Sequence, residues 1–435
     1  MTTGIDGGPT VHIGVLGCGN VGAPLVALIG AQADAIAART GLRLRVTRIA
    51  VRDLAKPRPA TIDTSLLTTD AEGVVNDPDV DLVVELIGGV VTARELIQSA
   101  IKAGKPVVTG NKELLAESGA ELFQAAEGAG VDLLFEAAVA GGIPIIRPLR
   151  ESLVGEHITR VMGIVNGTTN YILTRMTEAG ASYDDALAEA QALGFAEADP
   201  TADVEGYDAG AKVAIIASIA FGAAVTASDV HHEGISGITG VDIAFAKRMG
   251  FVIKLLAVAD QSDDGQIGVR VHPAMVPLAH PLAAVRESFN AVFVEGASVG
   301  DLMFYGRGAG GGPTASAILG DVIDAALNRH KGSHASVGQL GTATIRPIED
   351  VESAYYLNLE VLDRPGVLAQ VAGVFAEHRV SIRSMEQEGL GDEARLIFIT
   401  HRAREADVQS TLRDLGALEA VDRIGSVMRV IGDES

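Results

Sequence analysis

The sequence predicts an α/β protein with three successive parts. In residues 1–135, short apolar segments typical of buried strands alternate with helical segments, as in a parallel sheet. Residues 136–310 mix strands and helices less regularly, and residues 354–435 follow the βαββαβ order of a ferredoxin-like module. Aliphatic side chains and Ala dominate the 48% hydrophobic fraction, while aromatic residues make up 4%. This balance suits parallel strands better than a disulfide scaffold or a disordered chain.

A net charge of −22 and a single cysteine limit the function classes that the chain suits. Such an acidic protein is a poor partner for nucleic acid or an anionic membrane. The one cysteine, Cys18, cannot form an intrachain disulfide, which fits a reducing compartment. The N-terminus lacks the basic and apolar segments of a signal peptide, and no apolar run reaches the roughly 18 residues of a membrane span. We therefore expect a soluble cytoplasmic protein.

A glycine-rich turn near the N-terminus predicts the cofactor site. Residues 11–17 are typical of a short buried strand, which runs into a G-x-G-x-x-G turn and then a single helical segment. Glycines there let the backbone approach a pyrophosphate, and the helix N-terminus supplies free N–H groups. The triplet alone is weak evidence, but the next strand, at 42–53, completes a βαβ unit. We predict a Rossmann-type doubly wound domain whose turn binds a dinucleotide through Gly17, Gly19, Asn20, Val21 and Gly22.

The end of the second strand should carry the group that contacts the adenosine ribose. An acid there favours a free 2′-hydroxyl, whereas an arginine favours a 2′-phosphate. The sequence offers both, because Asp53 follows Arg52, and Lys56 and Arg58 are close behind. The local positive charge favours NADP(H) over NAD(H), although such basic residues also suit a solvated loop.

Ligands of a parallel sheet bind at the carboxyl ends of its strands. Gly88 closes one predicted strand, and Asn111 and Lys112 follow the next one. We expect these residues near the nicotinamide and the substrate, although Lys112 is also an ordinary choice at a helix start. A later loop of small residues, 137–144, exposes many carbonyls and few side chains. It suits either a monovalent cation or a tight domain junction.

An acidic segment, 194–212, leads into an apolar helix. It carries five carboxylates ahead of one lysine, namely Glu197, Asp199, Asp203, Glu205, Asp208 and then Lys212. Asp208 and Lys212 are four residues apart and share a face on a helix. A lysine held by acids suits proton transfer. The alternative is a helix start that carries acids because the helix dipole favours them. The spacing alone leaves both interpretations open.

The last part of the chain begins after a predicted linker. Residues 331–353 are rich in Ser, Gly and Thr and lack apolar periodicity. Before them, a second glycine-rich helix start at 306–315 suggests that residues 311–330 return to the cofactor region and complete the first domain. We expect the ferredoxin-like module to be an independent unit. Its turn at 363–368 presents free N–H groups suited to a small carboxylate.

Together these motifs resemble the homoserine dehydrogenases, in the monofunctional form with a C-terminal ACT module. The resemblance covers nearly the whole chain through GVLGCGNVG, VRDLAK, ELIGG, VVTGNK, FEAAVAGGIPII, GIVNGTTNYIL, GFAEADPTADVEGYDAGAK, GRGAGGGPTASAILGD and LDRPGVLAQVAGVF. The TGNK and EADPxxDxxGxDxxxK patterns are specific, whereas the glycine triplet is not. The resemblance implies a reversible, NAD(P)H-dependent reduction of L-aspartate 4-semialdehyde to L-homoserine, in threonine, methionine and isoleucine biosynthesis.

The resemblance also implies roles at the reactive centre. Lys212 matches the proton-transfer lysine, and Lys112 matches the second catalytic lysine, which also contacts substrate and cofactor. Glu197 and Asp208 match the residues that hold the substrate amino group, and Asp203 matches the acid that orients Lys212. The implied cofactor set is completed by Arg52, Gly88, Gly194 and Gly310.

Further ligands follow from the same resemblance. It implies a monovalent cation, Na⁺ by preference, bound mainly through backbone carbonyls of Glu136, Val139, Gly141 and Ile143. The ACT module implies inhibition by threonine at a turn formed by Asp363, Pro365, Gly366, Val367 and Leu368. Residues 136–310 are implied to hold the substrate and to dimerise, so we expect a homodimer or homotetramer.

Two competing functions are open to a chain with these motifs. Oxidation of an aldehyde to an acid or acyl phosphate needs a thiolate nucleophile. Cys18 lies inside the turn that should face the pyrophosphate, which argues against this chemistry. A non-catalytic sensor, in which NADPH and an amino acid control assembly, is the alternative from a different class. It leaves the lysine-and-carboxylate segment without a role.

Overall fold

The computed structural model describes residues 8–389 and 393–432, so the outermost residues of the first and last predicted parts lie outside it. The chain forms two compact units, each assembled from separate segments. The first contains residues 1–158, 211–229 and 295–343, and the second contains residues 159–210, 230–294 and 344–435. The chain crosses between the two units within residues 136–310.

The first unit contains a parallel sheet in the order β3-β2-β1-β4-β5-β6. Its strands are β1 (Thr10–Leu16), β2 (Arg43–Ala50), β3 (Leu67–Thr68), β4 (Leu82–Glu85), β5 (Val107–Thr109) and β6 (Leu133–Leu134). The inner strands are continuous apolar runs, and all four residues of β4 are buried. The predicted doubly wound parallel sheet is confirmed.

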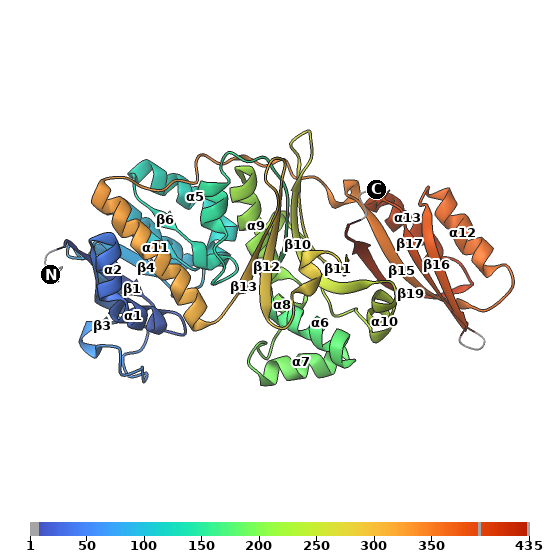
Figure 1. The fold of residues 1–435 in the computed structure, drawn as a ribbon, viewed down its shortest axis with the longest axis horizontal. Helices are drawn as coiled ribbons and strands as arrows, with labels where there is room; N and C mark the ends of the chain where they lie inside the picture. The colour runs from blue at the N-terminus through green and yellow to red at the C-terminus, as the bar shows by residue number, and fades with distance from the viewer. Residues whose placement is uncertain (1–7, 390–392, 433–435) are drawn as a thin grey trace. The chain divides into compact units, whose positions relative to one another are not determined.

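Helices pack on this sheet and carry its connections (Figure 1). They are α1 (Gly22–Ala31), α2 (Ala33–Thr40), α3 (Ala71–Asn76), α4 (Val91–Lys102), α5 (Lys112–Ala129) and α11 (Gly311–Lys331). The single helix expected after the glycine turn is two helices, because Gln32 leaves helical geometry with φ −101° and ψ 5°. Ile318 and Val322 of α11 are buried in one core with Ile13 and Val15 of β1. Helix α11 therefore belongs to the predicted cofactor domain.

The rest of the first unit consists of short elements and part of a longer helix. The short elements are η1 (Thr64–Leu66), η2 (Glu136–Ala138), the π-helix η3 (Pro148–Ser152), β8 (Ala223–Ala224), η4 (Ala227–Asp229), β13 (Gly300–Arg307) and β14 (Gly341–Thr342). Strands β8 and β14 pair in parallel. Helix α9 (Tyr207–Phe221) begins in the second unit and continues in the first.

The second unit is built around a mixed sheet in the order β12-β7-β10-β11-β19-β15-β17-β16. Its first half contains β7 (Ile158–Ile164), β10 (Phe251–Gln261), β11 (Ile267–Pro277) and β12 (Phe289–Gly296), with β9 (His231–His232) beside β11. The helical elements are α6 (Gly167–Ala179), α7 (Tyr183–Ala192), α8 (Thr201–Val204), α10 (Gly240–Arg248) and η5 (Pro281–Ala284). The antiparallel β10–β11 hairpin supplies the longest pairing of this half.

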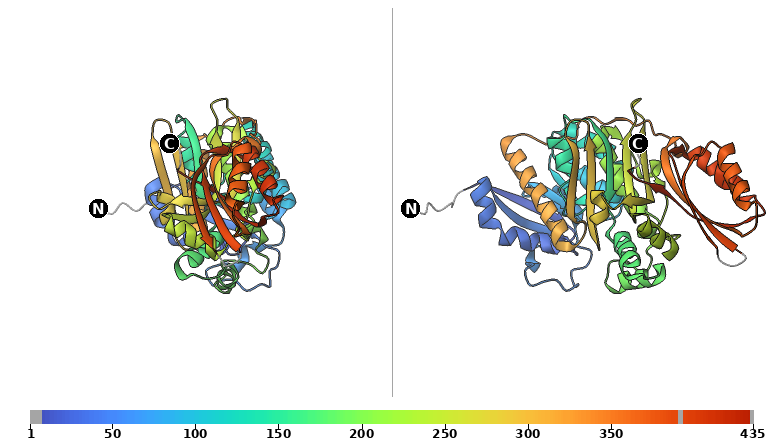
Figure 2. Two further views of the ribbon diagram at one scale, coloured as in Figure 1. Left: turned by 90° about the vertical axis from the view of Figure 1, so that its right-hand side faces the viewer. Right: turned by 45° about the vertical axis from the view of Figure 1, so that its right-hand side comes forward.

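The C-terminal half of this sheet has the predicted βαββαβ order. It contains β15 (Glu352–Leu362), α12 (Val367–Glu377), β16 (Ile382–Gly389), β17 (Glu393–Thr400), α13 (Glu405–Gly416) and β19 (Val421–Val430), with the short β18 (Ala403–Arg404) and, before β15, η6 (Ile348–Asp350). Helices α12 and α13 lie on one face of these strands (Figure 2). The expectation that this module is independent is wrong. Strand β19 pairs with β11 at Ala274↔Arg429 and Met275↔Val430, so backbone hydrogen bonds continue the sheet.

Candidate active site

The glycine turn has the geometry that a dinucleotide phosphate requires. Gly17 has φ +104°, and a Cβ there would lie 2.5 Å from the Leu86 carbonyl oxygen. A Cβ at Gly22 would lie 2.1 Å from the Gly17 carbonyl oxygen, whereas one at Gly19 would meet nothing within 4 Å. No side chain caps the start of α1 at Val21. The turn is therefore packed against protein backbone at Gly17 and Gly22 but has open space at Gly19. Gly19 lies next to a helix N-terminus, which suits an anion.

The second glycine-rich helix start lies against this turn. A Cβ at Gly311 would be 2.2 Å from the backbone oxygen of Asn20. Gly310 precedes α11 with φ +110°, a conformation that side chains disfavour. The structure thus brings Gly311 and Asn20 together, as the two glycine motifs had suggested.

Basic residues follow β2, where the ribose contact was expected. The Arg58 guanidinium donates hydrogen bonds to the backbone oxygens of Asp53 (2.8 Å) and Lys56 (2.9 Å). Burial raises the pKa of the Cys18 thiol, and the nearby Arg58 opposes that rise. Asp53 accepts a hydrogen bond from the Ala55 N–H at 2.8 Å, so its side chain closes the local turn. Arg58 therefore lies close to the glycine turn, while the exposed Arg52 directly follows the strand.

A buried acid organises the strand ends near Gly88 and Lys112. Glu85 is fully buried and accepts hydrogen bonds from the N–H groups of Ile87 (2.8 Å) and Gly88 (3.2 Å). Its other oxygen accepts one from the Thr109 hydroxyl at 2.6 Å. The Asn111 amide donates to the Gly89 oxygen at 2.7 Å and caps α5, which begins at Lys112. Glu85 thereby fixes the loop after β4 to the end of β5. Our sequence reasoning missed it.

The small-residue loop forms a tight backbone junction inside the first unit. All four predicted cation-site residues, Glu136, Val139, Gly141 and Ile143, are buried. The Glu136 carboxylate accepts hydrogen bonds from the backbone N–H groups of Ile145 (2.5 Å), Ile146 (2.8 Å) and Arg147 (2.9 Å). A Cβ at Gly141 would lie 2.3 Å from the Gly308 oxygen.

This loop fits a cation held by carbonyl oxygens rather than by side chains. Ala140 and Gly141 both have φ +53°, in the left-handed region that side chains disfavour. Among the described residues, no group of three or more His, Cys, Asp and Glu side chains forms a metal cluster. Backbone oxygens are the ligands that a hard cation such as Na⁺ accepts.

The acidic segment is tied together by a residue that sequence reasoning did not single out. The Asn166 side-chain nitrogen donates hydrogen bonds to Asp203 Oδ1 (2.6 Å) and to Asp208 Oδ2 (2.8 Å). Asp208 lies in the first turn of α9, one turn before Lys212, so the two share a helix face. The only sequence signal for Asn166 is a polar residue before the predicted helix start of α6, where it is the N-cap.

The other acids of the segment have different surroundings. Asp199 accepts hydrogen bonds from the Thr201 N–H (3.1 Å) and hydroxyl (2.7 Å), so it starts α8. Glu205 accepts one from the Ser236 hydroxyl at 2.8 Å. Glu197 is exposed, and its backbone oxygen accepts a hydrogen bond from Gln191 at 3.0 Å. Gly194, with φ +76°, ends α7 just before them.

The turn predicted to bind an effector lies at the start of α12. Gly366 is its N-cap, with φ +94° and no side-chain cap. Val367 is buried and Leu368 is 37% exposed. The Val367 N–H donates to the Arg364 oxygen at 3.3 Å, and no side chain caps the start of α12 beside Asp363 and Pro365.

The comparisons with known proteins agree with this arrangement. The family described as "Homoserine dehydrogenase, NAD binding domain" matches residues 17–136, "Homoserine dehydrogenase" matches 144–323 and "ACT domain" matches 355–420. The homoserine dehydrogenase of Corynebacterium glutamicum is 51% identical over 431 residues, which cover 98% of this chain and 97% of that protein. The chain belongs to the homoserine dehydrogenase family.

Solved homoserine dehydrogenases share the fold. The structure of the enzyme from Thiobacillus denitrificans is similar with a TM-score of 0.93 and 43% identity, over 97% of this chain and 99% of that chain. A hyperthermophilic archaeal homoserine dehydrogenase, solved in complex with NADPH, has a TM-score of 0.62 and 29% identity, over 73% of this chain and 98% of its own. The predicted ACT module and the oxidoreductase class with a nicotinamide cofactor are confirmed.

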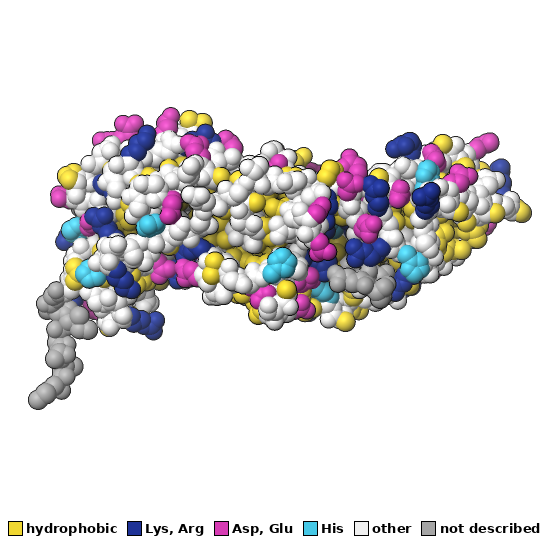
Figure 3. All heavy atoms as spheres, turned by 90° about the horizontal axis from the view of Figure 1, so that it is seen from above, with side chains coloured by type: hydrophobic (Ala, Val, Ile, Leu, Met, Phe, Trp, Pro, Cys, Tyr) yellow, Lys and Arg dark blue, Asp and Glu magenta, His cyan; other side chains and the backbone are white. Residues whose placement is uncertain are grey.

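The helices and one face of the molecule can be described in the same terms. Within the described residues, none of the helices combines the length and apolar character needed to cross a membrane. On the face shown in Figure 3, Lys and Arg side chains are interspersed with Asp and Glu. The predicted site residues are divided between the two units: the glycine turns, Lys112 and Lys212 belong to the first unit, and the carboxylates of the acidic segment belong to the second.

Proposed function

We propose that the protein catalyses the reversible NADP(H)-dependent interconversion of L-aspartate 4-semialdehyde and L-homoserine. The observation that carries the proposal is α9, which presents Asp208 and Lys212 on one face, with Asp208 linked through Asn166 to Asp203. This chemistry needs a proton at the substrate oxygen and negative charge at the substrate ammonium. One helix offers both kinds of group.

The proposed roles divide among four sets of residues. NADPH, when bound at the glycine turn, supplies the hydride. Lys212 donates the proton to the substrate oxygen in reduction and accepts it in oxidation, and Lys112 stabilises the negative charge that develops there. Glu197 and Asp208 hold the substrate ammonium. Asp203 orients Lys212, and neither lysine acts as a nucleophile.

The preference for NADP(H) over NAD(H) rests on the basic residues after β2. Arg52 directly follows the strand, and Arg58 lies near Cys18 in the glycine turn. Asp53 is engaged by the Ala55 N–H, which leaves the arginines as the groups suited to a 2′-phosphate. The archaeal relative was solved with NADPH, which agrees with this choice.

Four further features belong to the same proposal. The carbonyls of Glu136, Val139, Gly141 and Ile143 hold Na⁺, and the turn at 363–368 binds threonine as a feedback inhibitor. The cofactor domain consists of residues 1–135 with 311–330, and the catalytic and dimerisation domain consists of residues 136–310. A linker at 331–353 leads to the regulatory domain, residues 354–435. The active protein is a cytoplasmic homodimer or homotetramer in threonine, methionine and isoleucine biosynthesis.

Homoserine-dependent reduction of NADP⁺, followed at 340 nm as is usual for nicotinamides, tests the proposal. We expect turnover with homoserine, lower kcat/KM with NAD⁺, stimulation by Na⁺ and inhibition by threonine. D-Homoserine is the matched substrate control, because its ammonium cannot reach the same carboxylates. NADP⁺ binding without any homoserine oxidation would instead favour the non-catalytic sensor.

A further inference from the structure

The amide of Asn166 is shared by two acidic side chains from different helices. Its nitrogen lies 2.6 Å from Asp203 Oδ1, just after the start of α8, and 2.8 Å from Asp208 Oδ2, at the start of α9. Asn166 itself precedes α6 and is only 5% exposed. All three residues belong to the second unit. One buried side chain therefore joins the starts of three helices.

The orientation of this amide is fixed by its other end. Asn166 Oδ1 accepts hydrogen bonds from the Thr169 N–H at 2.9 Å and from the Thr169 hydroxyl at 3.0 Å. Because a backbone N–H can only donate, the oxygen of the amide must face Thr169 and the nitrogen must face the carboxylates. The two amide hydrogens then match the two carboxylate oxygens.

Holding two carboxylates at one nitrogen brings like charges together. The two acceptor oxygens lie at most 5.4 Å apart, the sum of their distances to the nitrogen. At such a separation the charges repel each other unless a donor or cation lies with them. An amide supplies the donors without adding positive charge. A lysine or arginine in its place would add one. Asn166 thus keeps the two carboxylates close together.

We propose that Asn166 is a positioning residue for substrate binding, which holds Asp208 beside Asp203 in the geometry in which Asp208 receives the ammonium of the amino-acid substrate. The proposal rests on the proposed function, because that function places an ammonium at Asp208. The start of α6 also contacts the chain just before the acidic residues, since the Thr168 hydroxyl donates to the Phe195 oxygen at 2.6 Å. Asn166 acts through the two acids and does not itself transfer a proton or a hydride.

Two substitutions separate this role from helix capping. Asn166→Asp and Asn166→Ser both keep a side chain that caps helices well, but neither supplies the two N–H donors. We expect each to raise the KM for homoserine about tenfold or more, while the KM for NADP⁺ changes less than about twofold. Ser182→Ala is the matched control, because Ser182 caps α7 through the Asp185 N–H and contacts neither Asp203 nor Asp208. It should lower the unfolding midpoint without changing either KM.

The KM values of the variants test the positioning role, and the activity of the unchanged protein tests the proposed function. If the unchanged protein oxidises homoserine and both Asn166 variants keep its KM within twofold, the positioning role is wrong and the proposed function stands. An equal rise in both KM values would mean a general structural defect and would also overturn the role. If Asn166→Asp fails to fold, Asn166→Ser decides alone. No homoserine oxidation by the unchanged protein refutes the proposed function itself.

Discussion

Single buried polar residues hold the predicted site residues in place. Glu85 fixes the loop that contains Gly88, and Asn166 joins Asp203 to Asp208. Both are almost inaccessible to solvent, at 0% and 5% exposure. Buried polar groups need hydrogen-bond partners, so their contacts specify one local geometry. The side chains to which we assign chemistry, such as Lys112 and Lys212, are more exposed than these anchors.

Replacing Lys212 tests the proton-transfer role. We expect Lys212→Ala to lower kcat for homoserine by about 10³-fold, because general acid–base catalysis contributes about 10²–10⁴-fold. NADP⁺ binding, measured by its effect on the unfolding midpoint, should persist. Lys247→Ala is the matched control, since Lys247 is exposed in the last turn of α10. Turnover near the level of the unchanged protein would remove Lys212 from the mechanism.

Asp321 of α11 gives a pH dependence of stability. Burial, together with the charge of Glu136, raises the pKa of Asp321 from 3.8 to about 7, although the Glu136 N–H and Arg147 oppose the rise. The folded state then binds a proton that the unfolded state has lost, so stability falls as pH rises from about 4 to about 7. About 3 pKa units, at roughly 1.4 kcal/mol each, set an upper limit of about 4 kcal/mol.

The stability of the Asp321→Asn variant, relative to that of the unchanged protein, should therefore increase as the pH rises. The variant keeps an acceptor for the Glu136 N–H, which lies 2.8 Å from Asp321, but it cannot ionise. We expect its unfolding midpoint, relative to that of the unchanged protein, to rise between pH 5 and pH 8. The exposed Asp301→Asn is the comparison variant. A constant offset across this range would show that Asp321 does not change its protonation there.

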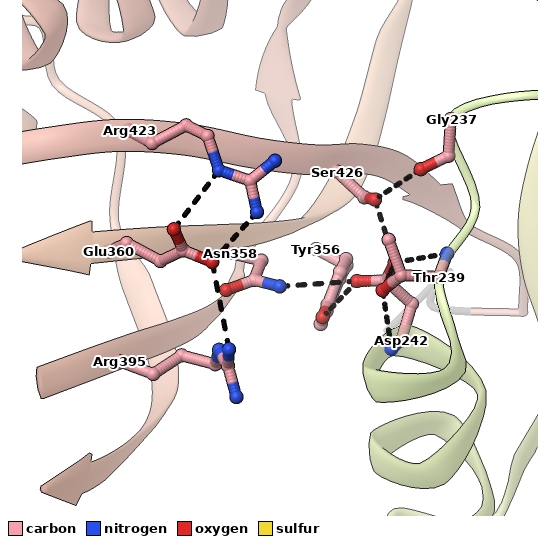
Figure 4. A network of polar contacts seen from close by, with 9 residues as sticks. All are labelled: Gly237, Thr239, Asp242, Tyr356, Asn358, Glu360, Arg395, Arg423 and Ser426. Carbon is pink, nitrogen blue, oxygen red and sulfur yellow. Dashed lines mark hydrogen bonds and ion pairs between the residues drawn. The ribbon is translucent and has the colours of Figure 1, made fainter. Parts of the chain in front are cut away.

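At the scale of elements, helix α10 is attached to the C-terminal strands through one buried acid. Asp242 is fully buried and completes a capping box with Thr239. It also accepts hydrogen bonds from Tyr356 (2.8 Å) and Asn358 (3.3 Å) of β15 and from Ser426 (2.7 Å) of β19 (Figure 4). Successive side chains of β15 point to opposite faces of the sheet. Tyr355 and Leu357 face the core under α12 and α13, so Tyr356 and Asn358 face Asp242 on the other side.

Removing this acceptor should cost far more than losing a helix cap. Asp242→Ala leaves several buried donors unpaired, and we expect a loss of about 3–5 kcal/mol in unfolding free energy. Asp185→Ala is the matched control, because Asp185 has the same position in the exposed start of α7, and its loss should be about 0.5–1 kcal/mol. Urea titrations measure both. Similar losses would mean that the contacts to β15 and β19 add little.

At the scale of the whole molecule, the C-terminal module is built into the second unit by a buried ion-pair network. Arg429 of β19 is 3% exposed and contacts Glu233 at 2.7 Å and Glu405 at 2.5 Å. Burial alone would raise the pKa of Glu233, but His231 and Arg429 outweigh it and hold that pKa at about 2. The sheet and this network together make the module part of a larger body.

Arg429→Met should destabilise the protein by about 3–5 kcal/mol at pH 7, because the buried Glu405 and the partly exposed Glu233 lose their counter-charge. The depressed pKa of Glu233 contributes stability above about pH 4.5 that is lost as the pH falls toward 2, so the penalty should shrink on acidification. Arg423→Met, on the same strand, breaks the exposed pair with Glu360 and should cost less than about 1 kcal/mol. Equal penalties at pH 7 and at about pH 3 would contradict this account.

The sequence alone determined the features that depend on neighbours along the chain. The glycine turn, the alternation of strands and helices, the βαββαβ order and the Asp208–Lys212 spacing are local patterns, and each has a direct counterpart in the structure. Local backbone preference and hydrophobic periodicity are sufficient for such features. The same reasoning failed at Gln32, where one expected helix becomes two.

Only the tertiary structure decided which distant residues meet. Asn166 is 42 residues from Asp208, Glu136 is 185 from Asp321, and Glu233 is 196 from Arg429. It also decided that the C-terminal module shares a sheet with β11. The physical reason is that a buried polar group takes whichever partner the packing brings within hydrogen-bond distance. No local pattern in the chain encodes that partner.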